Sequence, residues 1–217
     1  MEPIPSYCFR MPKIVDRAAR RRQVADAAVR LVSQYGLDEV TIAKVAAEAG
    51  VSVGLVQHYF RSKDELLLCA FERVIERVRE RVEAAGGGMT VEMTLRRSLL
   101  ELVPLDSERE AEAGSWIAFC ARVSVNPRLA GVYAACMAEV RTWLARALRK
   151  AKRLGEVPDW LDPELEALTL SALLDGLTLN ARNDPAGIPP ALIVASIDAY
   201  LDRVFDPNSQ PRGREHR

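Results

Sequence analysis

Apolar residues recur at intervals of three and four along almost the whole of this 217-residue chain. That spacing places them on one face of an α-helix, whereas a half-buried strand would require alternation, which is rare here. The pattern predicts an all-α protein of about nine helices. Because 49% of the residues are hydrophobic, such a chain can bury a substantial core.

Charge is balanced over the whole chain but uneven at its beginning. The 30 basic and 30 acidic residues cancel, so the overall charge does not favour nucleic-acid binding. Between residues 10 and 22, however, only Asp16 opposes a run of basic residues, which are Arg10, Lys13, Arg17, Arg20, Arg21 and Arg22. We expect residues 1–16 to form a disordered basic arm, which is either a solvated leader or a contact to nucleic acid.

Several classes of function are disfavoured by residues that the chain lacks. The histidines are His58 and His216, and no two cysteines have CxxC spacing, so we expect no metal, no cofactor and no disulfide framework. A Ser/His/Asp or Cys/His set cannot be assembled, so we expect no enzyme. No apolar run approaches the roughly 20 residues that span a bilayer, which predicts a cytoplasmic protein without membrane contact. The cysteines are Cys8, Cys69, Cys120 and Cys136.

Two short helical patterns lie on either side of the segment 50–52, Gly-Val-Ser. Thr41 opens the first pattern and Gly50 ends it, and Ser52 is placed to cap the second. Val53, Val56 and Phe60 are expected to face the core. Together with a preceding helix over residues 20–35, these patterns predict a helix-turn-helix.

A long helix is predicted to follow this motif. Ser62 and Glu65 have the spacing of a capping box, in which each side chain satisfies a backbone amide. The helix continues without a breaker to Ala85 and is long enough to connect two domains. We therefore expect a DNA-binding domain at residues 17–62, an effector-binding and dimerisation domain at 63–205, and a disordered tail at 206–217.

The second helix of a helix-turn-helix enters the major groove, so its outward side chains should bind DNA. Gln57 can pair with an adenine edge and Leu55 can touch a thymine methyl group. Lys63, at the start of the long helix, can bind a phosphate, as can Thr41 and Lys44 on the first helix. The remaining outward residues are Ser52, Gly54, His58 and Tyr59. The alternative is that these are surface residues of a small helical subdomain.

The segment 41–67, TIAKVAAEAGVSVGLVQHYFRSKDELL, resembles the signature of the TetR family of bacterial repressors. The resemblance implies DNA-facing roles for Thr41, Lys44, Ser52, Gly54, Gln57, His58, Tyr59 and Lys63. Many members have tyrosine where this chain has Gln57, so their base preference is not transferred. Further along, SWIAFCARVSVNPRLAGVYAACMAEVRTWL and ALLDGLTLNAR are similar to the body of the choline-responsive, BetI-type regulators.

Aromatic residues of the C-terminal half are candidates for binding a small-molecule effector whose identity the sequence does not give. The candidates are Trp116, Phe119, Tyr133 and Trp143. Such residues are usually core, but their ring faces would also bind a cation if a carboxylate lay nearby. Asp175, Glu139 and Glu112 are candidates for that carboxylate, and the alternative for Asp175 is an ion pair with Arg122 or Arg182 at a subunit interface.

The last two predicted helices have wide apolar faces that are suited to a four-helix interface between two copies. One face contains Leu165, Leu168, Ala172, Leu173 and Gly176, and the other contains Ile193, Ile197, Tyr200, Leu201 and Val204. These features predict a homodimeric, ligand-responsive repressor that binds a palindromic operator in double-stranded DNA. The alternatives are a small helical enzyme and a protein-interaction module.

Overall fold

The computed structural model describes residues 13–37, 39–87, 90–123 and 125–206, with side chains from Arg17 onward. These residues form nine helices and no strand, which confirms the all-α prediction. The helices are α1 (Lys13–Tyr35), α2 (Ile42–Glu48), α3 (Val53–Tyr59), α4 (Lys63–Ala85), α5 (Val91–Leu100), α6 (Ser107–Val123), α7 (Pro127–Arg153), α8 (Pro163–Asn183) and α9 (Pro190–Val204). None of these helices combines the length and apolar character that crossing a membrane requires.

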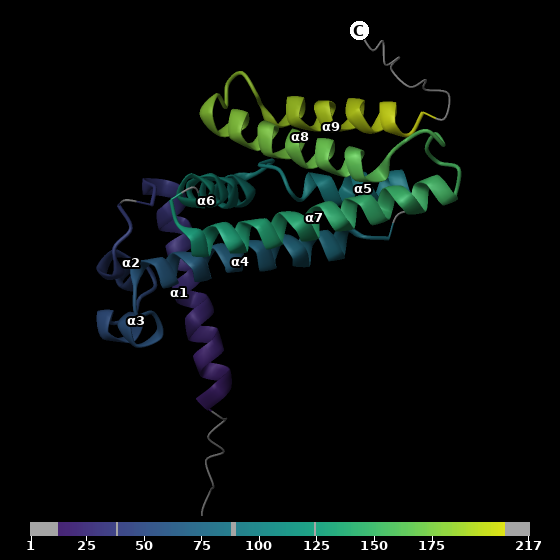
Figure 1. The fold of residues 1–217 in the computed structure, drawn as a ribbon. Helices are drawn as coiled ribbons and strands as arrows, with labels where there is room; N and C mark the ends of the chain where they lie inside the picture. Colours follow the sequence, from purple (N-terminus) through teal and green to yellow (C-terminus); the bar gives the residue numbers. More distant parts are fainter. Residues whose placement is uncertain (1–12, 38, 88–89, 124, 207–217) are drawn as a thin grey trace, which may run out of the picture.

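Helices α1, α2, α3 and the beginning of α4 form a small head at one end of the molecule (Figure 1). Its core contains Val24, Val45, Val56, Phe60 and Leu66, each at most 1% exposed. A turn between α2 and α3 is possible because Gly50 adopts a φ of +64°, a left-handed conformation that favours glycine. The predicted helix-turn-helix is therefore present.

The capping residues expected from the sequence start α4 as predicted, with one difference. The Ser62 side chain accepts a hydrogen bond from the Glu65 backbone amide at 3.1 Å. The Glu65 carboxylate, however, accepts from the Arg61 amide at 2.9 Å, one residue before the cap. The beginning of α4 is thus fixed from both sides.

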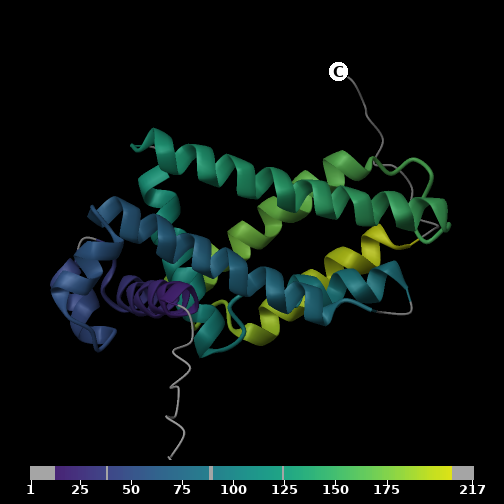
Figure 2. The same cartoon turned by 90° about the horizontal axis from the view of Figure 1, so that it is seen from below.

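The remaining helices form a body around a second core. Helices α5, α7, α8 and α9 contribute its buried residues, which include Leu95, Leu144, Leu170, Ile193 and Ile197. Viewed from below, α4 and α7 lie apart, and α8 crosses between them (Figure 2). Side chains of α4, α7 and α8 line a cavity in this part of the body, together with residues of α6.

The head and body also meet where α1 packs against α6. A Cβ atom on Gly114 would lie 3.2 Å from the Ser33 side-chain oxygen and 3.4 Å from the Ser33 Cα atom. The Ser115 hydroxyl donates a hydrogen bond to the Val29 carbonyl at 3.1 Å, and Ser115 is 7% exposed. The absence of a side chain at Gly114 thus allows a close approach between α6 and the first helix of the head.

Three expectations from the sequence are wrong. Helix α1 begins at Lys13, well before the expected start at Arg20. Val53, expected in the core, is 43% exposed, because it is the first residue of α3 and lies beyond the head core. The apolar face of α9 is not a free interface, since Ile193, Ile197 and Leu201 are at most 2% exposed in the core of the body. Residues 1–12 and 207–217, where an arm and a tail were expected, lie outside the described residues.

Candidate nucleic-acid interface and ligand cavity

Helix α3 presents hydrogen-bonding side chains to solvent. Gln57 and His58 are exposed, and so are Ser52 and Gly54 at its beginning. Val56 is fully buried and holds the opposite side of α3 against the head core. A helix fixed on one side and polar on the other can enter a DNA groove without rearrangement.

The expected groove residues that are not fully exposed lie at the edges of this surface. Leu55 and Tyr59 are half-buried. The Tyr59 ring contacts the His58 ring edge-on, with 5.3 Å between the ring centroids. Leu55 and Tyr59 are thus still partly accessible to solvent.

Two hydroxyl groups of the interface cap the helices on which they lie. The Thr41 side chain accepts from the Lys44 amide and the Ser52 side chain accepts from the Leu55 amide, each at 3.2 Å. A hydroxyl that accepts in this way still has its own hydrogen to donate, for example to a phosphate oxygen. Capping and phosphate binding are therefore compatible roles for Thr41 and Ser52.

The two expected lysines both act on the carboxylate of Glu39. Lys44 forms an exposed ion pair with Glu39, with an Nζ–Oε2 distance of 2.8 Å. The hydrogen bond and charge of Lys44, and to a smaller extent the charge of Lys63, lower the pKa of Glu39. Lys63 is half-buried at the first position of α4. The two lysines are therefore close enough to affect the same carboxylate.

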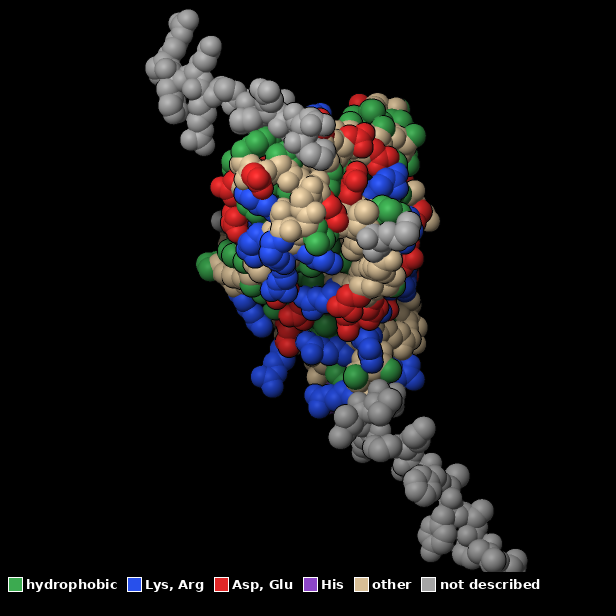
Figure 3. Space-filling model, turned by 90° about the vertical axis from the view of Figure 1, so that its right-hand side faces the viewer, with side chains coloured by type: hydrophobic (Ala, Val, Ile, Leu, Met, Phe, Trp, Pro, Cys, Tyr) green, Lys and Arg blue, Asp and Glu red, His purple; other side chains and the backbone are tan. Residues whose placement is uncertain are grey.

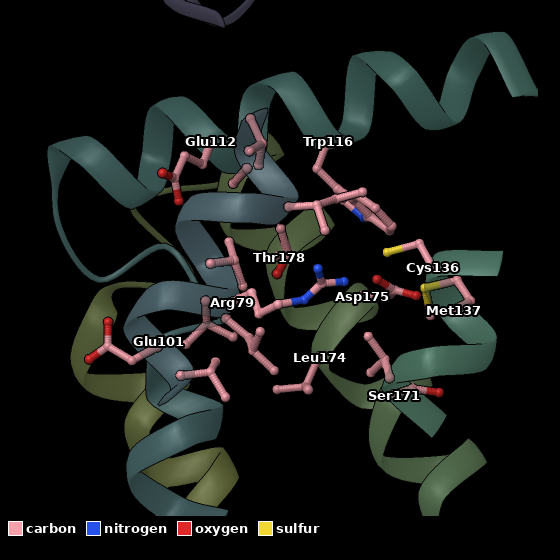
Figure 4. Close-up of a pocket in the computed structure, with 18 of the residues that line it drawn as sticks. Arg79, Glu101, Glu112, Trp116, Cys136, Met137, Ser171, Leu174, Asp175 and Thr178 are labelled. Carbon is pink, nitrogen blue, oxygen red and sulfur yellow. The ribbon is translucent and has the colours of Figure 1, made fainter. Parts of the chain in front are cut away.

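A cavity of about 370 Å³ lies between α4, α6, α7 and α8. Its walls are mostly apolar and include Val74, Val78, Leu102, Met137 and Leu174. This volume is within the range of small-molecule binding sites, which are mainly apolar with a few well-placed polar groups. Figure 4 shows Arg79, Trp116, Cys136 and Asp175 around one part of the cavity, with Glu101 and Glu112 in another.

The structure brings together some of the residues expected to bind an effector. Trp116, Trp143 and Asp175 line the cavity. Phe119 and Tyr133 do not line it, and belong to an adjacent aromatic cluster in which the Trp116 and Tyr133 ring centroids are 5.6 Å apart. A ligand confined to the cavity would therefore contact Trp116 but not Phe119 or Tyr133.

Asp175 is a half-buried carboxylate in this mostly apolar cavity. Burial raises the pKa of Asp175, and a hydrogen bond from the Trp116 side chain partly opposes this effect. Within one chain, no ion pair joins Asp175 to Arg122 or Arg182 among the described residues, and the Arg182 guanidinium donates to the Ser33 carbonyl at 3.0 Å. The ion pair expected at a subunit interface stays a prediction. The cavity thus contains a carboxylate that could bind a cation or a hydrogen-bond donor.

Ion pairs connect the cavity to the head. Asp26 of α1 lies 3.0 Å from both Arg73 and Arg77 of α4. Arg77 lies 3.8 Å from Glu112 of α6, which Arg81 of α4 also binds. We call Asp26, Arg73, Arg77, Arg81 and Glu112 the ion-pair ladder. The ladder was not predicted from the sequence, although the four-residue spacing of its three arginines was a signal for it.

The described cysteines have the properties of inert thiols. Burial, with a smaller effect of the nearby Asp175, raises the pKa of Cys120 to about 12. Burial also raises the pKa values of Cys69 and Cys136. Since the thiolate is the reactive form, these cysteines are poor nucleophiles near neutral pH.

A helix-turn-helix head joined by one long helix to a helical body with a cavity defines a DNA-binding transcriptional regulator. Two family models match the chain: bacterial regulatory proteins of the tetR family over residues 24–70, and the C-terminal domain of BetI-type transcriptional repressors over residues 91–206. The chain belongs to the TetR family and has a BetI-type C-terminal domain.

Individual relatives agree with this assignment. The regulator PksA of Bacillus subtilis is 28% identical over 207 residues, covering 95% of this chain and 100% of PksA. The regulator BetI of Escherichia coli strain UTI89 is 31% identical over 175 residues, covering 79% of this chain and 86% of BetI.

Solved structures have the same fold. A transcriptional regulator from Rhodococcus sp. RHA1 is 29% identical in sequence. It superposes with a TM-score of 0.77, and the superposition covers 88% of this chain and 99% of that one. A transcriptional regulator from Saccharomonospora viridis, solved in complex with choline, is 23% identical, with a TM-score of 0.79 over 85% of this chain and 96% of that one.

Proposed function

We propose that this regulator is a dimeric repressor that binds a palindromic operator and releases it when a small molecule enters the cavity. The observation that carries the proposal is the course of α4. Its first residue, Lys63, lies in the head, and its residues from Val74 to Val82 line the cavity. A ligand that moves this helix would therefore also move the DNA-binding surface. Such a protein is expected to act in the cytoplasm, where its operator would be.

Dimerisation is supported by the exposed face of α8. Leu165, Leu168 and Leu179 are 54%, 52% and 45% exposed, respectively, although large aliphatic side chains are usually buried. Ala172 and Gly176 lie on the same helix and would allow another helix to approach closely. A two-fold dimer formed through this face would present two copies of α3 to successive turns of a duplex.

The chemistry of the cavity favours an apolar effector that carries a cation or a hydrogen-bond donor. The apolar walls would bind the body of the molecule, and Asp175 would bind its charged or polar group, with the Trp116 and Trp143 rings nearby. The Saccharomonospora viridis regulator of the same fold was solved with choline, which makes choline the first compound to test.

Release of DNA requires the effector to bind the DNA-incompetent conformation more tightly. A coupling free energy of about 1–3 kcal/mol would weaken operator binding by about 5- to 150-fold. The ion-pair ladder supports this coupling, because Glu112 lines the cavity and Asp26 lies on the first helix of the head.

The proposal is tested by selecting duplexes that the purified protein retains from a random-sequence library, and then measuring operator affinity by fluorescence anisotropy. A palindromic consensus bound by a dimer is expected. Choline and other organic cations are then titrated into the complex. Retention of no duplex would overturn the proposal, and an operator complex unaffected by every compound would remove its ligand-responsive part.

Two variants separate the roles of the interface residues. Lys63→Ala should weaken binding to every duplex and reduce its salt dependence, because Lys63 is proposed to bind a phosphate. Gln57→Ala should instead change the sequence preference, because Gln57 is proposed to bind a base. Equal effects of both variants on every sequence would contradict this division.

A further inference from the structure

The N-terminal part of α1 extends beyond the head core. Every residue from Arg17 to Gln23 is exposed, and the first buried side chain of the helix is Val24. At 1.5 Å per residue, the exposed residues from Arg17 to Gln23 extend about 10 Å. In Figure 1 these residues project from the head beside α3, away from the body.

This projecting segment is strongly basic. Its charged side chains are those of Arg17, Arg20, Arg21 and Arg22, with no acidic residue among them. Arg17, Arg21 and Arg22 form no ion pair with a described carboxylate. Figure 3 shows Lys and Arg side chains gathered at the lower end of the molecule, where the described part of the chain begins. We call residues 17–22 the basic extension.

The basic extension adjoins the end of α3, the helix proposed to enter the DNA groove and called the recognition helix below. The Arg17 guanidinium lies 5.9 Å from the centroid of the Tyr59 ring, and the Arg21 guanidinium lies 5.6 Å from that of Phe60. The Gln23 side chain donates to the Ala49 carbonyl at 2.8 Å, which ties α1 to the turn before α3. The basic extension therefore has a fixed position relative to the groove-binding surface.

The positive charges of the basic extension repel one another when no anion is bound. Arg17 and Arg21 are four residues apart, so these like charges lie close together on one helix and repel. A row of anions would remove this repulsion and would gain from the release of counterions. The phosphates of a duplex provide such a row, and Arg and Lys side chains are among the groups that most often bind them.

We propose that the basic extension binds backbone phosphates just outside the half-site contacted by α3, and so lengthens the DNA that each protomer covers. This inference rests on the proposed DNA-binding function. The contact is independent of base sequence. It contributes affinity and salt dependence, while α3 determines which operator is bound.

The test compares two duplexes: the operator selected by the wild-type protein, trimmed to its consensus, and the same operator with random flanks of about one helical turn at each end. The variant Arg17→Ala/Arg20→Ala/Arg21→Ala is expected to lose at least about tenfold in affinity for the flanked duplex. Its salt dependence should fall by about one unit for each phosphate contact removed. Binding to the trimmed duplex should change much less.

Two further variants serve as controls: one removes charge at a remote site, and the other preserves the charge of the basic extension. Arg146→Ala/Lys150→Ala/Arg153→Ala removes the same charge from exposed positions on α7, remote from the head, and should bind both duplexes like the wild type. Replacing Arg17, Arg20 and Arg21 by lysine keeps the charge and should restore most of the affinity for the flanked duplex. Circular dichroism verifies that each variant is folded.

The outcomes distinguish this inference from the function on which it rests. Wild-type affinity and salt dependence in the alanine variant would overturn the inference and leave the proposed repressor intact. Equal losses on trimmed and flanked duplexes would place the contact inside the half-site, which also overturns it. Failure of the wild-type protein to bind any duplex would instead overturn the proposed function itself.

Discussion

Arg81 of α4 binds both oxygens of the Glu112 carboxylate of α6, with Nη1–Oε1 and Nη2–Oε2 distances of 3.0 and 2.5 Å. Glu112 is 4% exposed, so this pair is largely removed from solvent. Bidentate pairing of a guanidinium with a carboxylate is strong and directional. The helix that leads to the head is thereby attached to the wall of the cavity.

Glu112→Gln should destabilise the protein by about 2 kcal/mol, because it leaves the Arg81 charge without its main partner. Denaturant unfolding measures this change. A matched control exists in Glu139→Gln, since Glu139 pairs with Arg79 at 2.7 Å but its side chain is 67% exposed. The control should lose less than about 1 kcal/mol. Equal losses in both variants would contradict the importance assigned to burial.

Asp175 should make stability depend on pH. Because burial raises the pKa of Asp175 in the folded state, the folded protein retains a proton that the unfolded chain has already released as the pH rises above the ordinary value. The free energy of unfolding therefore falls as the pH rises through this window. Asp175→Asn should remove this fall, so its melting temperature should exceed that of the wild type at neutral pH and approach it at low pH.

The control for this pH dependence is Asp202→Asn, which changes an exposed carboxylate on α9. Its melting temperature should follow that of the wild type across the same pH range. If the wild-type and Asp175→Asn curves stay parallel from low to neutral pH, the carboxylate is not the source of the effect.

Two glycines of the head should respond differently to alanine. Gly50→Ala should cost about 1–2 kcal/mol in a melting experiment, because residue 50 has a left-handed φ of +64°, although no atom lies within 4 Å of the added Cβ. Gly54→Ala, in α3, also meets no atom and has no positive φ, so it should keep or raise stability.

Operator binding provides a second comparison of the same variants. If α3 lies against base edges at Gly54, the added methyl group should lower operator affinity about tenfold, which corresponds to 1.4 kcal/mol. A fully active Gly54→Ala protein would mean that DNA does not approach α3 closely there.

Leu168→Glu should separate the proposed dimer. In a two-fold interface the same residue appears twice, so the substitution adds two negative charges and should cost about 2–5 kcal/mol of association free energy. Size-exclusion chromatography should show a monomer, and operator affinity should fall with it. Leu154→Glu is the control, since Leu154 is 60% exposed at the end of α7, outside the α8 face. If the Leu168→Glu protein is still a dimer, the exposed face of α8 is not the dimer interface.

Local signals in the sequence were sufficient for the beginnings and ends of most helices. Thr41, Ser52 and Ser62 each cap the helix that they were expected to start. Such caps depend on residues a few positions apart. The start of α1 was missed because basic residues dominate the run from Arg10 to Arg22, and residues 1–16 were therefore expected to form a disordered arm.

The cavity and the ion-pair ladder depend on which helices meet, and this could not be derived from a single sequence. Trp116 and Asp175 were identified by residue type, but only the fold places them together and leaves Phe119 and Tyr133 outside. The face of α9 is a similar case. Its apolar pattern is real, but a pattern alone does not distinguish the core of one chain from an interface between two.

The contact of Gly114 with Ser33 gives the head a second point of attachment besides the chain itself in α4. Because the head is held at two separate points, it can rotate about the axis through these points more easily than it can shift. If α4 slides past α6, the recognition helix would then change its tilt in the groove, and a small displacement near the pivot would become a larger arc at Gln57.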